Sequence, residues 1–416
     1  MIKQIGPYVH YEHCRSCNSS NLVSFLNLGY VPLAGGFLTS QSQFKNEFYY
    51  PLEVCFCKNC FLVQTNNVVN KDILFKNYFY HTSAIKTLVD HFNNTAETIQ
   101  MLLHNVQKPL VVEIGCNDGM LLKALHEKTI TAVGVDPASN IVLPLIKKKF
   151  SIINDYFTET VANKIKKEFG KADIIFSSNT LAHIENIHAV FEGIKNLLKP
   201  EGILIFEVHY LDSILQGLQY DMIYHEHQYY YSVLALKNLL QQHNLEIFHV
   251  EPISIHAGSM RYFVKLKNSK KKITKAVKDI IKQERKMRYN KVQTYLTYGK
   301  KVLKTKKDLL AIIKKIKQKN KKIAGYGASG RSSVIMNYCD LDNSVLEAVI
   351  DDSQAKQGTY TPGMHVKIVD NSFIYKNIDY ILLFAWSFKN EIMPKLKKFR
   401  KEGGKVIIPL PKPKIV

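Results

Sequence analysis

The sequence predicts an α/β protein with two Rossmann-like parallel sheets and a small cysteine-rich domain before them. Three observations lead to this expectation: paired cysteines in the first 60 residues, strand and helix patterns that alternate over residues 86–264, and a second alternating pattern from Lys322 onwards. Alternation of this kind is typical of a parallel sheet that is covered by helices on both faces. We therefore expect four segments: 1–85, 86–264, 265–322 and 323–416.

Length and composition describe a folded protein of several domains. Of 416 residues, 46% are hydrophobic and 11% are aromatic. Such a chain is too long for one ordinary core and too apolar for a disordered protein. The N-terminus has no apolar signal-peptide stretch, and no uncharged apolar run reaches the roughly 18 residues of a membrane span. We therefore expect a cytoplasmic protein.

Two closely spaced cysteine pairs stand near the N-terminus. Cys14-Arg-Ser-Cys17 and Cys57-Lys-Asn-Cys60 are separated by 39 residues. Four thiolates on two tight turns suit the tetrahedral coordination of zinc, and a four-cysteine site leaves no position for a catalytic water. We therefore predict a structural Zn²⁺ site at Cys14, Cys17, Cys57 and Cys60, with Cys55 as a less well spaced substitute for Cys57.

A glycine turn follows the first strand pattern of the segment 86–264. Residues 110–119, LVVEIGCNDG, indicate a buried strand that breaks into a turn before a helix, and a second strand ends at Asp136, 21 residues after Gly115. Glycine lets a ligand approach the backbone, and an acid at this position can accept both hydroxyls of an adenosine ribose. The residues expected to bind an adenosine cofactor are Glu113, Gly115, Asn117, Gly119, Asp136, Asn154, Asp155 and Asn179.

Histidines and tyrosines gather after the strand pattern at 172–179 and again within 220–232. His183 follows that strand, and Tyr224-His-Glu-His227 brings four proton-handling groups into four residues. This density beside a cofactor fold favours a catalytic site over a structural loop, while the His-x-His spacing also permits a second metal. Residues 255–262, IHAGSMRY, add His256 and Arg261 at a turn of small residues that suits a polar ligand.

The order of these segments, from EIGCNDG to the LLKPEG turn at 197–202, resembles class I S-adenosylmethionine (SAM) methyltransferases. The cysteine pairs, NYFYHTS at 77–83, NTLAH, IYHEH and HAGSMRY further resemble the zinc-containing sugar C-methyltransferases of deoxysugar pathways, over essentially the whole chain. The resemblance implies transfer of a methyl group from SAM to a carbon of a nucleotide-linked 4-keto-6-deoxysugar, with C-3 as the commoner position.

The resemblance also implies roles for individual residues. His227 would be the base, with Tyr224 and Glu226 beside it and His183 at the ketone. The zinc domain would contribute Tyr78 or Tyr80, and we favour Tyr78 as the catalytic one. A ketone acidifies the neighbouring C–H, and a base of near-neutral pKa with hydrogen-bond donors to the enolate suits this chemistry. The residues expected to contact the substrate are Tyr80, His225, His256, Arg261, Gly327, Ser329, Arg331 and Lys356.

The C-terminal segment carries a second glycine fingerprint. The sequence GYGASG at 325–330 follows a strand pattern, and Asp351 lies 21 residues after Gly330. Taken alone it indicates a dinucleotide site, so an NAD-dependent sugar-nucleotide oxidoreductase is an alternative hypothesis. The resemblance implies instead that this domain binds the sugar nucleotide, with backbone N–H groups at the start of a helix facing its diphosphate.

Positive charge is concentrated between the two α/β segments. The formal net charge is +22, and residues 265–322 hold 23 Lys or Arg against 3 acids. Apolar residues there recur at helical spacing, which predicts amphipathic helices with a charged outer face. A basic helical linker is the favoured interpretation, and a methyltransferase that reaches RNA through these helices is a further alternative. We expect a monomer with no nucleic-acid or membrane partner and with a nucleotide-linked keto-sugar as substrate.

Overall fold

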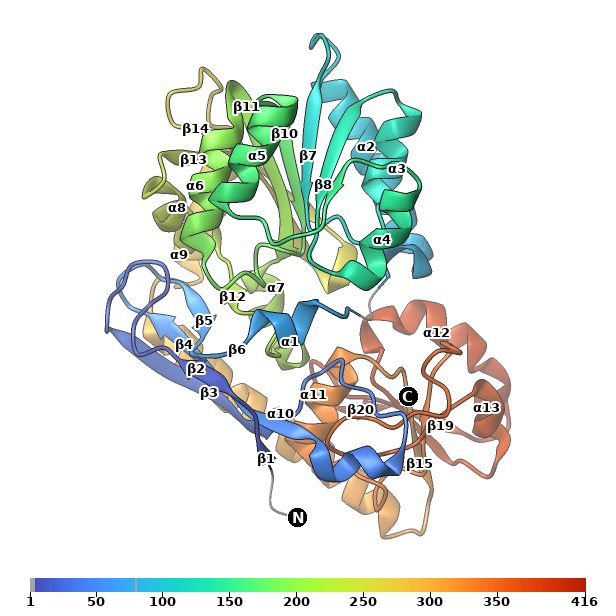
Figure 1. Ribbon diagram of the computed structural model, residues 1–416. Coiled ribbons are helices and arrows are strands. Elements are labelled where there is room, and N and C mark those ends of the chain that lie inside the picture. Colours follow the sequence, from blue (N-terminus) through green and yellow to red (C-terminus); the bar gives the residue numbers. More distant parts are fainter. Residues whose placement is uncertain (1–3, 79–80) are drawn as a thin grey trace.

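The computed structural model describes residues 4–78 and 81–416. The chain forms a small N-terminal β-region, a large α/β domain and a second α/β domain, with the short helix α1 (Lys71–Phe75) between them (Figure 1). Tyr80, one of the expected substrate contacts, lies outside the described residues. None of the helices in the described part of the chain combines the length and apolarity needed to cross a bilayer.

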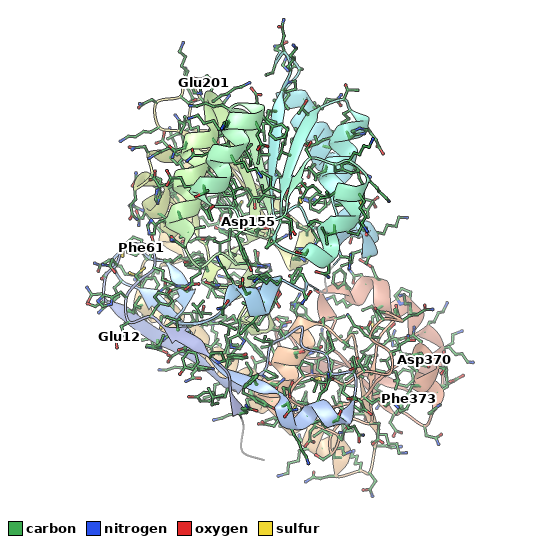
Figure 2. The ribbon with its side chains drawn as sticks, in the orientation of Figure 1. Glu12, Phe61, Asp155, Glu201, Asp370 and Phe373 are labelled. Carbon is green, nitrogen blue, oxygen red and sulfur yellow. The ribbon has the colours of Figure 1, made fainter. Side chains whose placement is uncertain are left out.

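The segment 86–264 forms the sheet that its alternating pattern predicts. In spatial order the strands are β13 (Leu245–Ile253), β14 (Ser259–Leu266), β11 (Leu198–His209), β10 (Ala172–Ser178), β7 (Leu110–Ile114), β8 (Thr131–Val135) and β9 (Ile152–Ile153). β14 pairs antiparallel with β11 and β13, and the other neighbours are parallel. The carboxyl ends of the parallel strands therefore meet at one edge, where Asp155 lies and which faces the other two parts (Figure 2).

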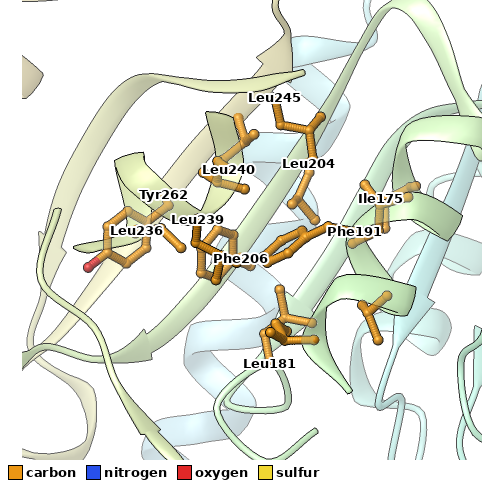
Figure 3. Close-up of a cluster of buried hydrophobic side chains, with 14 of the residues drawn as sticks. Ile175, Leu181, Phe191, Leu204, Phe206, Leu236, Leu239, Leu240, Leu245 and Tyr262 are labelled. Atoms are coloured by element: carbon orange, nitrogen blue, oxygen red, sulfur yellow. The ribbon is translucent and has the colours of Figure 1, made fainter. Parts of the chain in front are cut away.

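Helices cover both faces of this sheet and bury its strands. They are α2 (Lys86–Leu102), α3 (Met120–Glu127), α4 (Ser139–Lys147), α5 (Glu159–Phe169), α6 (Ile187–Leu197), α8 (Val233–Gln241) and α9 (Lys275–Lys286), with α7 (Leu211–Gln216) and the 3₁₀ turn η3 (Tyr220–Met222) below the sheet. Figure 3 shows Phe191 of α6 and Leu239 of α8 against Phe206 of β11. Each such fully buried side chain contributes about 1.5–3 kcal/mol, so this core fixes the sheet edge rigidly.

The N-terminal region consists of a separate two-stranded sheet and a larger sheet that continues into the large domain. Its strands are β1 (Gln4–Ile5), β2 (Tyr8–His10), β3 (Leu22–Val31), β4 (Phe48–Cys57), β5 (Val63–Thr65) and β6 (Asn67–Val69). β5 pairs antiparallel with β12 (Tyr229–Tyr230), which follows the histidine-rich loop almost directly. This pairing ties the N-terminal sheet to that loop.

The basic segment forms α9 and the long helix α10 (Val292–Lys317), as its amphipathic pattern predicts. α9 packs on α8 and β13, and α10 packs on β3 and on α11 (Gly330–Cys339). The inner face of α10 buries Tyr295, Tyr298 and Leu309, while its lysines point outward. Both helices are thus parts of the neighbouring cores.

The C-terminal segment forms the second Rossmann-like sheet that its pattern predicts. In spatial order the strands are β17 (Ile368–Val369), β16 (Val349–Ile350), β15 (Ile323–Tyr326), β18 (Tyr380–Leu383), β19 (Lys405–Ile408) and β20 (Lys414–Ile415), with α11, α12 (Lys389–Lys395) and α13 (Lys397–Lys401) beside them. All neighbours are parallel except β20, which runs antiparallel to β19. The glycine fingerprint lies between β15 and α11, at the carboxyl edge of the sheet.

Candidate active site

The four predicted zinc ligands come together at the tip of the N-terminal sheet. One sulfur atom from each of Cys14, Cys17, Cys57 and Cys60 lies within 4.8 Å of the others, and the Cys14 and Cys60 sulfurs are 3.5 Å apart. Tetrahedral zinc with Zn–S bonds of about 2.3 Å would hold its sulfurs about 3.8 Å apart, so this donor set fits zinc. Cys55 is buried but stands outside the cluster.

A cavity of about 1090 Å³ lies where the three parts of the molecule meet. Its wall includes Tyr78 from the N-terminal part, the loops after β7, β8 and β10, the Tyr224–His227 loop, and the glycine loop after β15. The two glycine loops and the histidine-rich loop, which are far apart in the sequence, thus face one space.

Gly115 and the carboxylates at the ends of β7 and β8 form one end of this cavity. A Cβ on Gly115, whose φ is +78°, would lie 2.0 Å from the Thr180 hydroxyl, so only glycine fits there. Asp136 accepts hydrogen bonds from the backbone N–H groups of Asn117 and Ala138, both at 2.9 Å. Burial, with Asp136 nearby, raises the pKa of Glu113, and its Oε2 has no partner among the described residues. These carboxylates fit a ligand with hydroxyl and ammonium donors, such as SAM.

The remaining expected cofactor residues divide between the cavity and its margin. Asn117 and Asn179 line the cavity. Asn154 and Asp155 line an adjoining hollow of about 310 Å³, and the Asn154 amide donates to the Asp136 carbonyl at 2.9 Å. Gly119 begins α3 in the left-handed conformation, where a Cβ would meet Leu145, and it does not line the cavity. Its role is to close the turn.

His227 is held in its neutral form. Its Nδ1–H donates to the Met222 carbonyl at 2.7 Å, so Nε2 carries the lone pair. The ring centroid of Tyr224 lies 4.0 Å from that of His227, and the ring of His183 lies 5.0 Å away. Burial lowers the pKa of His227 to about 4 and holds the pKa of His183 well below its usual range. Both imidazoles are therefore uncharged at pH 7.

Glu226 and Tyr78 form a second proton-handling pair. The Tyr78 hydroxyl donates to Glu226 Oε2 at 3.1 Å. Burial raises the pKa of Glu226 to about 7, and the Tyr78 hydrogen bond acts in the opposite direction. Asn140 of α4 makes two hydrogen bonds to the Tyr78 backbone, at 2.8 and 3.1 Å, and so fixes this segment on the cofactor domain. Sequence reasoning missed Asn140, because nothing in its surroundings marks it.

The structure places two expected substrate contacts elsewhere. The ring of His225 turns toward the N-terminal sheet, 5.6 Å edge-on from Tyr50, and does not line the cavity. Arg261 stands opposite Glu207 in the β11–β14 pairing and forms a buried ion pair with it at 2.6 Å. Contrary to expectation, neither side chain reaches the cavity: the His225 ring packs against the N-terminal sheet, and Arg261 is paired with Glu207.

The other expected contacts do line the cavity. They are His256 and, from the C-terminal domain, Gly327, Ser329, Arg331 and Lys356. The Arg331 guanidinium, however, is used by the protein: Nε donates to Asp221 and Nη1 donates to Ser387. His91 and His209 also line the cavity and were missed. The position of His209 at the carboxyl end of β11 could have indicated it, whereas His91 lies on the helical pattern of α2 without a signal.

Three family models together account for most of the chain. Residues 14–75 match a zinc binding domain, residues 89–250 a methyltransferase domain, and residues 254–411 a C-methyltransferase C-terminal domain. The chain is 29% identical over 406 residues to C-methyltransferase NovU from Streptomyces niveus, covering 97% of each protein. It is 27% identical over 95 residues to a ubiquinone biosynthesis O-methyltransferase of Bartonella tribocorum, covering 23% of this chain and 38% of that one.

Solved structures of methyltransferases also match part of the chain. A SAM-dependent methyltransferase from Clostridium acetobutylicum is 16% identical with a TM-score of 0.33, covering 42% of this chain and 91% of that chain. A magnesium protoporphyrin IX methyltransferase from Synechocystis with bound SAM is also 16% identical, with a TM-score of 0.32, covering 43% and 80% respectively.

The domain order, the two Rossmann-like sheets and the four-cysteine cluster agree with the family models along the chain. The expected cofactors, SAM and structural zinc, are those of the matched domains. The protein is therefore a SAM-dependent methyltransferase whose three parts match, in order, a zinc binding domain, a methyltransferase domain and a C-methyltransferase C-terminal domain.

Proposed function

We propose that this enzyme transfers the methyl group of SAM to C-3 of a nucleotide-linked 4-keto-6-deoxysugar. The observation that carries the proposal is the convergence of two glycine loops and the His227 loop on one cavity of about 1090 Å³. A pocket for one drug-sized ligand measures about 300–1,000 Å³, so this one has room for a cofactor and a second ligand. The similarity to NovU supports carbon as the methylated atom.

The two ends of the cavity suit different ligands. Glu113, Gly115 and Asp136 would hold SAM. At the other end, α11 begins at Gly330 behind the glycine loop, with Ser329 as its N-cap. Backbone N–H groups at such a helix start bind phosphate oxygens, and Lys356 adds a positive charge beside them. The nucleotide diphosphate would therefore lie against the C-terminal domain, with the sugar between it and SAM.

The residues between these ends suit carbon methylation. SAM, when bound, supplies an electrophilic methyl group. His227 Nε2 would remove the proton from the carbon beside the ketone, and His183 and Tyr224 would hold the enolate oxygen by donated hydrogen bonds, with Tyr78 bonded to Glu226 beside them. Holding the nucleophilic carbon against the methyl group in one geometry would lower the barrier further.

Mass spectrometry of incubations with SAM and a panel of nucleotide 4-keto-6-deoxysugars tests the proposal. We expect a product one methyl group heavier from at least one of these sugars, with the new methyl carbon bonded to carbon in a ¹³C NMR spectrum. Protein with His227→Asn is the control and should form product at least about 10²-fold more slowly. A methyl group on oxygen or nitrogen, or turnover of a nicotinamide cofactor instead, would refute the proposed function.

A further inference from the structure

A single buried carboxylate links the C-terminal domain to the histidine-rich loop. Asp221, in the turn η3, is fully buried. Its Oδ2 accepts a hydrogen bond from Arg331 Nε and another from Trp386 Nε1, both at 2.8 Å. Both donors belong to the C-terminal domain: Arg331 is the second residue of α11, and Trp386 follows β18.

The same turn determines which nitrogen of His227 is the base. Met222, the next residue, offers the carbonyl that accepts the His227 Nδ1–H bond at 2.7 Å. This bond selects the tautomer in which Nε2 keeps its lone pair. Tyr220, at the other side of Asp221, packs edge-on against Tyr338 of α11, with ring centroids 5.4 Å apart. All three residues of the turn thus contact either the C-terminal domain or the catalytic imidazole.

We propose that Asp221 is a positioning residue through which the C-terminal domain keeps His227 in its basic tautomer. Arg331 and Trp386 hold the carboxylate, the carboxylate holds the turn, and the turn presents the Met222 carbonyl to Nδ1. The proposal rests on the role of His227 as the base. It also means that Arg331 binds Asp221 of the same protein, whereas the sequence predicted that Arg331 contacts the substrate.

The buried position of Asp221 depends on the contact with the C-terminal domain. A buried carboxylate that loses its partner is strongly destabilised, because neither water nor a second charge replaces the lost interaction. Asp221 Oδ1 already has no partner among the described residues, so the two C-terminal donors are its principal stabilisation. Where the C-terminal domain is displaced, Asp221 must turn to solvent, and Met222 moves with it.

A second hydrogen bond between domains provides a matched control. Glu47, from the N-terminal region, accepts a hydrogen bond from His365 Nε2 of the C-terminal domain at 2.7 Å. The Glu47 side chain is 6% exposed, and neither residue lines the cavity. Glu47→Gln therefore weakens a buried contact of the same domain without touching η3.

The experiment compares Asp221→Asn, Trp386→Phe and Glu47→Gln with the natural protein. ¹⁵N NMR of histidine-labelled protein reports the tautomer of His227, and Trp386, the sole tryptophan, reports its own hydrogen bond through its fluorescence. We expect Asp221→Asn to give a mixed tautomer, a shifted emission, and turnover lowered about tenfold or more with SAM affinity within about twofold. Trp386→Phe should give a smaller loss of turnover and a partly mixed tautomer. Glu47→Gln should change only the free energy of unfolding.

The proposal is overturned if Asp221→Asn keeps the natural tautomer, or if Glu47→Gln alters the tautomer equally. If Asp221→Asn does not fold, Trp386→Phe decides the same question with one donor removed. The NMR measurement needs no sugar substrate. A changed tautomer in an enzyme that methylates none of the tested keto-sugars would therefore support the positioning role and refute the substrate assignment.

Discussion

Single residues in the cavity wall owe their chemistry to burial more than to their intrinsic character. Burial lowers the pKa of His227 to about 4 and raises that of Glu226 to about 7, so at neutral pH the imidazole is uncharged while the carboxyl group is half ionised. The imidazole can therefore accept a proton across the physiological range, but its pKa lies below the near-neutral value that suits a general base.

Replacement of His227 tests its role directly. In His227→Asn the Asn side chain can still contact the Met222 carbonyl, but no basic nitrogen remains. We expect turnover to fall about 10²–10⁴-fold, the usual contribution of a positioned general base, while the dissociation constant for SAM stays unchanged. Equilibrium binding and initial rates measure both quantities. Near-normal turnover in this variant would rule out the assignment.

The hydrogen bond between Tyr78 and Glu226 predicts a pH dependence. Ionised Glu226 accepts this bond, so activity should rise as pH increases through about 7. Because the Tyr78 hydroxyl stabilises the carboxylate, Tyr78→Phe should raise the pKa of Glu226 further and move the midpoint to higher pH. Glu226→Gln should remove the step. Profiles of kcat/KM against pH measure this, and an identical midpoint in all three proteins would contradict it.

The sequence predicted candidate residues but could not orient all of them. Residue type and spacing marked His227, Glu226 and Tyr224, and all three line the cavity. Whether a neighbour faces the cavity depends on pairings made across the fold, and this is why His225 and Arg261 were misplaced. Asp221 was missed for the same reason: its partner Arg331 is 110 residues away in the chain.

At the scale of elements, strand and helix patterns predicted both sheets because their periods follow from burial on both faces. The short pairing of β12 with β5 was not predictable, since two residues carry no periodic signal. Yet this pairing connects the zinc-bearing sheet to the catalytic loop. Zinc bound at the four cysteines would therefore stabilise this loop through the sheet, at a distance from the cavity.

Removal of one zinc ligand tests this connection. Cys57→Ser should lower the zinc content from about one ion per chain to near zero and lower the melting temperature, because metal binding and folding of the region are coupled. Cys55→Ser, two residues away on the same strand, is the matched control and should keep its zinc. Metal analysis and calorimetry distinguish the two, and equal zinc loss would contradict the assignment of the ligands.

The glycine turn after β7 permits a similar comparison. Gly115→Ala places a Cβ against Thr180, whereas Gly29→Ala has a similar φ of +81° and open space around it. We expect the first change to cost about 1–3 kcal/mol more in the free energy of unfolding than the second. SAM affinity should fall only in Gly115→Ala, as titration calorimetry can show. Equal costs would mean that the turn is not tightly packed.

At the scale of the whole molecule, three parts that are remote in sequence build one cavity, and none of them contains a complete site. The cofactor end belongs to the large sheet, Tyr78 comes from the N-terminal part, and the second glycine loop comes from the C-terminal domain. The order of motifs along the chain predicted each of the three parts and its fold. Their arrangement around one cavity depends on packing between elements, such as α10 on β3 and η3 on α11, which no local pattern encodes.

Hydrogen exchange into a keto-sugar tests the central claim, that this cavity generates a carbon nucleophile. The enzyme is incubated with a nucleotide 4-keto-6-deoxysugar in D₂O without SAM, and the sugar is examined by NMR and mass spectrometry. We predict deuterium at the carbon beside the ketone with the natural enzyme and none with His227→Asn, followed by carbon methylation when SAM is added. Methylation without any exchange at that carbon, or exchange that persists in His227→Asn, would contradict the account.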